Sequence, residues 1–238
     1  MPVRRLAMLL SACALVAPAA ARAQAIAGPV TGGTAAPSGD VWLMPTAGML
    51  VGAPTSLRGA APARDAGRTV TVERFDAATG SWIALAASTV AGDGSYRARW
   101  RPDVTGVLLV RARIDRGAGR TGGTGAAAAA NAASAEIAMT VYRPALASWY
   151  GPGFYGRKTA CGVKLTRRLL GVAHRTLPCG TPVAISYGGA SITVPVVDRG
   201  PFKRGRRWDL TAAAAAALGF TFTDRIGAVA LPAQPASR

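Results

Sequence analysis

The segments AHRTLPCGTPV, residues 173–183, and VPVVDRGP, residues 194–201, decide the fold of the C-terminal third of this chain. The first contains His174, the single histidine of the 238 residues. In the second, the valines predict a mostly buried strand that ends at Asp198, and Gly-Pro then marks a turn. An acid is therefore expected at the end of a buried strand.

Further motifs surround these two segments in a fixed order. They are a Tyr-Gly turn at 150–151, a Thr-Ala element at 159–160, a Gly-Gly hairpin at 188–189, and Asp-Leu at 209–210 before an alanine run. Together they resemble the double-psi β-barrel of the rare lipoprotein A (RlpA) family of bacterial cell envelopes. The resemblance implies an all-β domain over residues 146–232, a six-stranded barrel with one short helix. Thr211 is expected near the N-cap of that helix, and Gly219 at its end.

The resemblance also implies an activity. RlpA-type lytic transglycosylases are lyases that bind peptidoglycan and cut its glycan strands. The 6-hydroxyl of muramic acid attacks within its own sugar and leaves a 1,6-anhydro product. One group can protonate the leaving oxygen and then accept the hydroxyl proton. This route suits a domain with three aspartates and no glutamate.

The site residues implied by the resemblance and its motifs fall into two groups. The catalytic candidates are Asp198, as the acid, His174 and Asp209. Asp209 is either a second site residue or an anchor for the helix. The candidates for substrate binding are Tyr150, Tyr155, Arg175, Thr176 and Arg199. If Arg199 turns outward, Asp198 is free to act as an acid, whereas an ion pair between them would make that carboxylate structural.

Two other functions stay open. One is a noncatalytic, expansin-like module that binds or loosens the wall, and the other is a secreted, barwin-type domain that binds a protein. No cofactor or metal is expected, because one histidine and a cysteine pair supply too few ligands for zinc. This domain also lacks a Gly-x-Ser-x-Gly elbow and a glycine-rich phosphate loop.

The N-terminus reads as an export signal over residues 1–23. Arg4 and Arg5 precede an apolar stretch, and a small-x-small site ends at Ala23. The alternative is a lipoprotein anchored through Cys13. Either interpretation places the mature chain outside the cytoplasm, in the periplasm, the cell wall or the medium, without a transmembrane span and without a nucleic-acid partner.

Removal of the leader leaves Cys161 and Cys179, an even count in a chain bound for an oxidising compartment. A disulfide between them is expected, with two reduced, buried thiols as the alternative.

The chain carries a formal charge of +17, which falls to +14 without Arg4, Arg5 and Arg22. From residue 147 onward, thirteen Lys and Arg face three acids, so the barrel is the basic part. Such a field favours polyanions. For an exported protein we expect peptidoglycan and acidic wall polymers, although a genome rich in G and C also explains an excess of arginine.

The N-terminal half predicts a second domain. A Gly, Ala and Pro-rich spacer at 24–41 is followed by period-two patterns in 42–143, which predict an immunoglobulin-like β-sandwich. Tyr96, Ala98 and Trp100 are one such pattern. The low-complexity stretch 116–134 is expected as a loop between the last two strands, or else as a linker to the barrel.

Overall fold

The structure, a computed structural model, describes residues 41–116 and 132–232. Strands dominate the fold, with one α-helix and a short 3-10 helix at Ala63–Asp65. The elements are β1 (Trp42–Leu43), β2 (Met49–Leu50), β3 (Thr55–Ala60), β4 (Thr69–Asp76), β5 (Ser81–Thr89), β6 (Ser95–Trp100), β7 (Gly106–Ile114), β8 (Ala132–Ala133), β9 (Ile137–Tyr150), β10 (Val172–Ala173), β11 (Pro182–Tyr187), β12 (Ala190–Asp198), β13 (Trp208–Thr211), α1 (Ala212–Ala217) and β14 (Asp224–Ala230).

The N-terminal half forms two β-sheets around one core. One sheet has the order β1-β3-β6. The other runs β5-β4-β7-β9, with β8 beside β7 and β2 beside β9. In β6, Tyr96, Ala98 and Trp100 are buried while the residues between them are exposed, as the period-two pattern predicts. The immunoglobulin-like topology itself stays a prediction.

The C-terminal half forms a closed barrel. Its strands follow the order β13-β10-β12-β11-β14-β9, and β9 pairs with β13 to close the ring. Val183, Val194 and Leu210 are among the side chains that fill its core. The predicted six-stranded barrel with one short helix is confirmed. Thr211 caps α1 by accepting a hydrogen bond from the Ala214 N–H, and Gly219 follows the helix at a φ of 65°.

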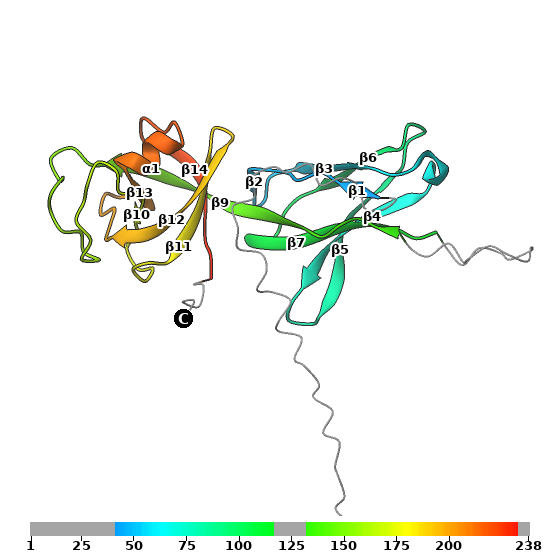
Figure 1. Ribbon diagram of the computed structural model, residues 1–238, viewed down its shortest axis with the longest axis horizontal. Coiled ribbons are helices and arrows are strands. Elements are labelled where there is room, and N and C mark those ends of the chain that lie inside the picture. The colour runs from blue at the N-terminus through cyan, green and yellow to red at the C-terminus, as the bar shows by residue number, and fades with distance from the viewer. Residues whose placement is uncertain (1–40, 117–131, 233–238) are drawn as a thin grey trace, which may run out of the picture.

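One continuous strand, β9, belongs to both halves (Figure 1). Residues 137–141 pair with β7, residues 143–147 pair with β14, and residues 147–150 pair with β13. The boundary expected near residue 143 therefore falls inside a strand. A Cβ at Gly227 of β14 would lie 3.0 Å from the Leu50 side chain of β2, so the two halves pack closely against one another there.

Several expectations concern residues outside the described ranges: the export signal at 1–23, Cys13, the spacer up to residue 40, and residues 117–131 of the low-complexity stretch. Near the C-terminal end of that stretch, β8 pairs antiparallel with the end of β7, which precedes the stretch. No helix in the described part of the chain is long and apolar enough to cross a membrane.

The predicted disulfide between Cys161 and Cys179 is present and spans 18 residues of sequence. It joins the Thr-Ala element to the loop that follows His174. Both segments are coil with few ladder hydrogen bonds, so the bridge supplies much of the restraint between them.

Loss of this bridge should destabilise the protein. We expect a double variant, Cys161→Ser with Cys179→Ser, to lose about 3 kcal/mol of unfolding free energy, since a loop of this length becomes unrestrained in the unfolded chain. Urea unfolding measures the change. A reductant should lower the stability of the native protein to that of the variant and leave the variant unaffected. Equal stability of the oxidised native protein and the variant would contradict the expectation.

Candidate functional site

Four strands of the barrel place two aspartates in one row. Ala173 of β10 is opposite Asp198 of β12 on one side and Asp209 of β13 on the other, and Asp209 is in turn opposite Ser148 of β9. Directly opposed residues project to the same face of a sheet. With strands about 4.8 Å apart, the Cα atoms of the two aspartates lie about 10 Å apart across Ala173.

Asp198 is half-buried at the end of β12. A bulge in the pairing of β10 with β12 lets it face Ala173. Its Oδ1 accepts hydrogen bonds from the backbone N–H groups of Ala160 and Arg199, both at 2.8 Å. Within the described residues neither hydrogen bond nor ion pair engages Oδ2. One carboxylate oxygen is thus held by the backbone, and the Tyr150 hydroxyl lies close enough to interact with the carboxylate.

Asp209 is also half-buried, and its Oδ1 accepts a 2.7 Å hydrogen bond from the Ser148 hydroxyl. Burial raises the pKa of the Asp209 carboxyl above its usual range, and the nearby Asp198 carboxylate adds to the rise. The hydrogen bond from Ser148 and the positive charge of Arg206 act in the opposite direction, without reversing it. The surroundings of Asp209 therefore make its carboxyl harder to ionise than an exposed aspartate.

Tyr150 ends β9 beside this pair. Burial raises the pKa of its phenol far above the ordinary value, and the Asp198 carboxylate raises it further through its charge and through a hydrogen-bonding interaction, with an added contribution from the charge of Asp209. Its Oη is buried and lacks a hydrogen bond of acceptable geometry within the described chain. Buried hydroxyls are normally satisfied, so an unpartnered one beside two carboxylates is available to a ligand.

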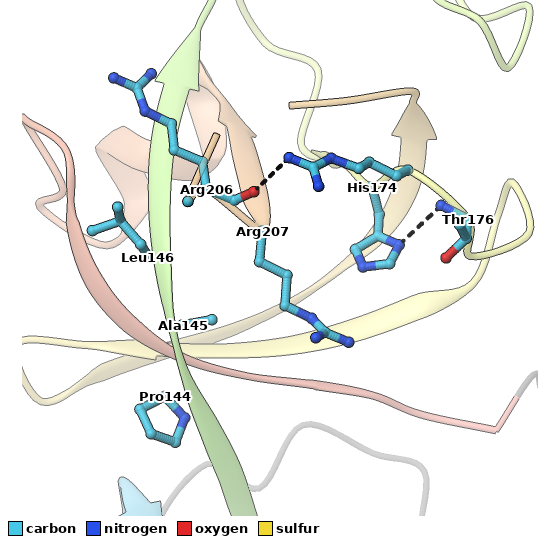
Figure 2. Close-up of a pocket in the computed structure, with 9 residues that line it drawn as sticks. Pro144, Ala145, Leu146, His174, Thr176, Arg206 and Arg207 are labelled. Carbon is cyan, nitrogen blue, oxygen red and sulfur yellow. Dashed lines mark hydrogen bonds between the residues drawn. The ribbon is translucent and has the colours of Figure 1, made fainter. Parts of the chain in front are cut away.

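His174 lies on another side of β10, in a pocket of about 490 Å³ that Figure 2 shows. Its ring packs on Trp208, with centroids 4.5 Å apart. Nδ1 accepts hydrogen bonds from the N–H groups of Thr176 and Leu177, at 3.3 and 3.1 Å. The neutral ring therefore carries its proton on Nε2. Burial lowers the pKa of His174, and Arg207, Arg175 and Arg199 lower it further.

The structure joins His174 to Asp198 through the backbone. The His174 N–H donates to the Asp198 carbonyl at 3.2 Å, but within the described residues no hydrogen bond connects the ring to the carboxylate. The two residues that the resemblance pairs thus face different surfaces: Asp198 and Asp209 share one, and His174 faces an arginine-lined pocket.

The arginines near the site have defined partners. Arg199 turns away from the Asp198 carboxylate, and its guanidinium donates to the His174 carbonyl at 3.4 Å. This is the arrangement that leaves Asp198 free. Arg175 donates to the carbonyls of Pro201, Lys203 and Arg206, so its guanidinium holds the loop that follows Asp198. The resemblance suggested substrate binding for Arg175, and these hydrogen bonds show that its guanidinium also has a structural role.

Tyr155 and Thr176 occupy different places. Tyr155 packs over Gly151, where a Cβ would come within 2.6 Å of its hydroxyl, and the Arg167 guanidinium lies 5.4 Å from its ring centroid. Thr176 is exposed at the mouth of the His174 pocket. The roles of both residues in substrate binding stay predictions.

Two features of the site escaped the sequence reasoning. Ser148 holds Asp209, and the Ala160 N–H holds Asp198. Ser148 stands two residues before Tyr150, so alternation along the strand would have placed both on one face. The hydrogen bond from Ala160 follows from a loop conformation and had no sequence signal.

The raised pKa of Asp209 makes a prediction about stability. A carboxyl whose pKa is raised on folding leaves the stability unchanged below its unfolded pKa, near 3.8, and opposes folding increasingly as the pH rises from that value to its folded pKa, above which the penalty is complete. We therefore expect Asp209→Asn to match the native protein at about pH 3 and to melt at a higher temperature at pH 7, where the raised pKa of the native carboxyl opposes folding. Thermal unfolding across pH 3–8 tests this. A variant less stable than the native protein at pH 7 would contradict it.

Comparisons with known proteins concern the barrel. Residues 144–231 match the family model described as lytic transglycolase. A probable endolytic peptidoglycan transglycosylase RlpA of Synechocystis sp. is 47% identical over 100 residues, covering 40% of this chain and 31% of that protein. The endolytic peptidoglycan transglycosylase RlpA of Campylobacter jejuni is 43% identical over 84 residues, covering 34% of this chain and 30% of that protein. The chain spans about a third of the length of these curated relatives.

Proposed function

Residues 144–231 of this chain are a domain of the RlpA-like double-psi β-barrel family of lytic transglycolases, and from that premise we propose that the protein is an exported lytic transglycosylase of peptidoglycan. It binds glycan strands and cuts them with formation of 1,6-anhydro ends. The observation that carries this proposal is the row of two aspartates across β12, β10 and β13, in which burial raises the pKa of Asp209 and the backbone holds one oxygen of Asp198.

The reaction needs two proton transfers and no water. The glycosidic bond between C1 of muramic acid and O4 of the next sugar breaks, and C1 bonds to O6 of the same muramic acid. One proton goes to O4 and one leaves O6, so the proton count balances. Groups that perform such transfers contribute about 10²–10⁴ to the rate.

The surroundings of the two aspartates divide this work. Asp209 donates the proton to the leaving oxygen, because burial raises the pKa of its carboxyl and so makes it a better proton donor than an exposed aspartate. Asp198 accepts the proton of the 6-hydroxyl through Oδ2, while the two backbone N–H groups hold Oδ1 in place. The sequence alone suggested Asp198 as the acid. The burial of Asp209 moves the donor role to that residue. His174 acts as a positioning residue at the adjoining pocket.

The test is digestion of purified peptidoglycan with the mature protein, followed by mass spectrometry for 1,6-anhydro muropeptides. Asp198→Asn is the inactive variant. Asp224→Asn is the matched control, because Asp224 lies in the same domain and bonds only Tyr187 and its neighbouring N–H. We expect anhydro products from the native protein and the control, and none from Asp198→Asn.

The same assay addresses the noncatalytic alternative. If the native protein sediments with the wall and releases no anhydro products, the barrel is an expansin-like binding module. The row of two half-buried aspartates favours the enzyme, because adhesion to a polymer that carries carboxylates gives no reason to place two acids side by side.

Tyr150→Phe should lower the activity of the protein while leaving its stability nearly unchanged. The hydroxyl lacks a partner in the described structure, so its removal should change the unfolding free energy by less than about 1 kcal/mol. Activity should fall about tenfold, since we expect the hydroxyl to bond to the bound sugar or to a carboxylate during the reaction. Initial rates of product release and thermal unfolding measure the two quantities. A large loss of stability would instead identify a structural hydroxyl.

A further inference from the structure

The pocket beside His174 is a separate feature from the aspartate row. It is bounded by residues 144–146 of β9, by the loop after His174, and by Arg206 and Arg207 before β13. Figure 2 shows the Arg207 guanidinium reaching toward the His174 ring, whereas the Arg206 side chain points away from it. The side chains of these two consecutive arginines thus point in different directions, and only the Arg207 guanidinium extends toward the His174 ring.

The groups that face this pocket are hydrogen-bond donors. The Arg207 guanidinium is exposed and lacks a hydrogen bond or ion pair anywhere in the described chain. The His174 ring has Nδ1 occupied by two backbone N–H groups, so Nε2 presents an N–H. None of the lining side chains is acidic. A donor-lined pocket with an unneutralised guanidinium fits a ligand that accepts hydrogen bonds and carries negative charge.

A second pocket of about 230 Å³ continues this one toward the N-terminal half. The two share Ala145 and Arg207, and the second adds Arg143 of β9 and Thr105, from the loop before β7. Its lining also lacks an acidic side chain. The two pockets adjoin at these shared residues and are here together called the arginine groove; the continuous strand β9 lines both of them.

We propose that the arginine groove is a binding site for a carboxylate group of the substrate, distinct from the aspartate row that performs the proton transfers. One guanidinium and one neutral imidazole N–H match the single charge and two oxygens of a carboxylate. At the His174 end of the groove a phosphate dianion would leave one charge without a partner, because the Arg206 side chain points away (Figure 2) and the Arg175 guanidinium binds backbone carbonyls. The proposal rests on the proposed function only for the source of the carboxylate, which in a wall polymer is a lactyl group of muramic acid or a stem peptide.

The experiment is calorimetric titration of the mature protein with three soluble probes. The first is the disaccharide of N-acetylglucosamine and N-acetylmuramic acid, which has a free lactyl carboxylate. The second is the same disaccharide with a stem peptide, in which the lactyl group is an amide and the carboxylates lie on the peptide. The third is chitobiose, which has no carboxylate. Inorganic phosphate serves as a competitor.

The variants are Arg207→Gln, Arg207→Lys and a matched control, Arg97→Gln. Arg97 is an exposed arginine of β6 and lines neither pocket. We expect the native protein and the control to bind at least one carboxylate-bearing disaccharide about tenfold or more tightly than chitobiose. Arg207→Gln should reduce that affinity to the level of chitobiose, and Arg207→Lys should retain part of it. Thermal unfolding verifies that each variant is folded.

The outcomes separate the two carboxylate sources and the two proposals. Preference for the bare disaccharide identifies the lactyl group, and preference for the peptide-bearing one identifies the stem peptide. Equal affinity for all three probes, equal affinity of native protein and Arg207→Gln, or displacement by phosphate better than by the disaccharide would each overturn the carboxylate site. Anhydro products together with such a result would leave the transglycosylase standing. Arg207-dependent binding without anhydro products would leave only the binding site.

Discussion

Asp198→Asn should lower the rate at which the mature protein releases 1,6-anhydro products from peptidoglycan by about 10²–10⁴-fold. Asparagine keeps the size of the side chain, and its Oδ1 can still accept the hydrogen bonds from Ala160 and Arg199. The geometry should therefore survive, while the oxygen that takes the proton is replaced by an amide that cannot. The measurement is the initial rate of product release, quantified by mass spectrometry.

Asp209→Asn completes this prediction. If the two acids work as a pair, each single variant should lose most of the activity, and the double variant should lose little more than either, because residues that act as a unit are not additive. The Asp209 variant is also expected to be more stable at pH 7, so its inactivity could not be attributed to unfolding. Nearly native rates in both single variants would refute the pair as the catalytic groups.

Gly59→Ala should destabilise the protein by about 4 kcal/mol, the largest stability effect that we expect from a single substitution. Gly59 is buried in β3, and an added Cβ would lie 2.0 Å from the Trp42 carbonyl oxygen and 2.1 Å from the Tyr96 hydroxyl. That hydroxyl donates a 2.6 Å hydrogen bond to the same carbonyl. The methyl group would have to displace both partners of a buried hydrogen bond.

Urea unfolding of Gly59→Ala and of a matched control, Gly92→Ala, measures this effect. Gly92 lies in an exposed turn where an added Cβ meets nothing within 4 Å, so its substitution should change the unfolding free energy by less than about 1 kcal/mol. Tyr96→Phe should share part of the loss, since it removes the hydrogen bond and leaves the space. Wild-type stability in Gly59→Ala would show that β1 and β3 can move apart at little cost.

Local sequence patterns were sufficient to predict many of the secondary-structure elements of this protein. Alternating apolar residues predicted β6, and the valines before Asp198 predicted β12 as a mostly buried strand. The alanine run after Thr211 predicted α1 with Thr211 near its N-cap, and an even cysteine count in an exported chain predicted the disulfide. Such features depend on the residue types within a few positions, or on the order of motifs, and both are visible in a sequence. The closed barrel followed from that motif order.

Tertiary structure decided how those features meet. The register of β10 with β12 and β13 places Asp198 and Asp209 on one face and leaves His174 on another, and a bulge sets that outcome. The protonation preference of Asp209 depends on burial by residues distant in sequence. The sequence predicted two domains with a boundary near residue 143, whereas β9 runs through it because each half of the strand finds partners in a different sheet. Register, burial and pairing partners depend on contacts between residues that are far apart in the sequence. They therefore become visible only in the folded structure.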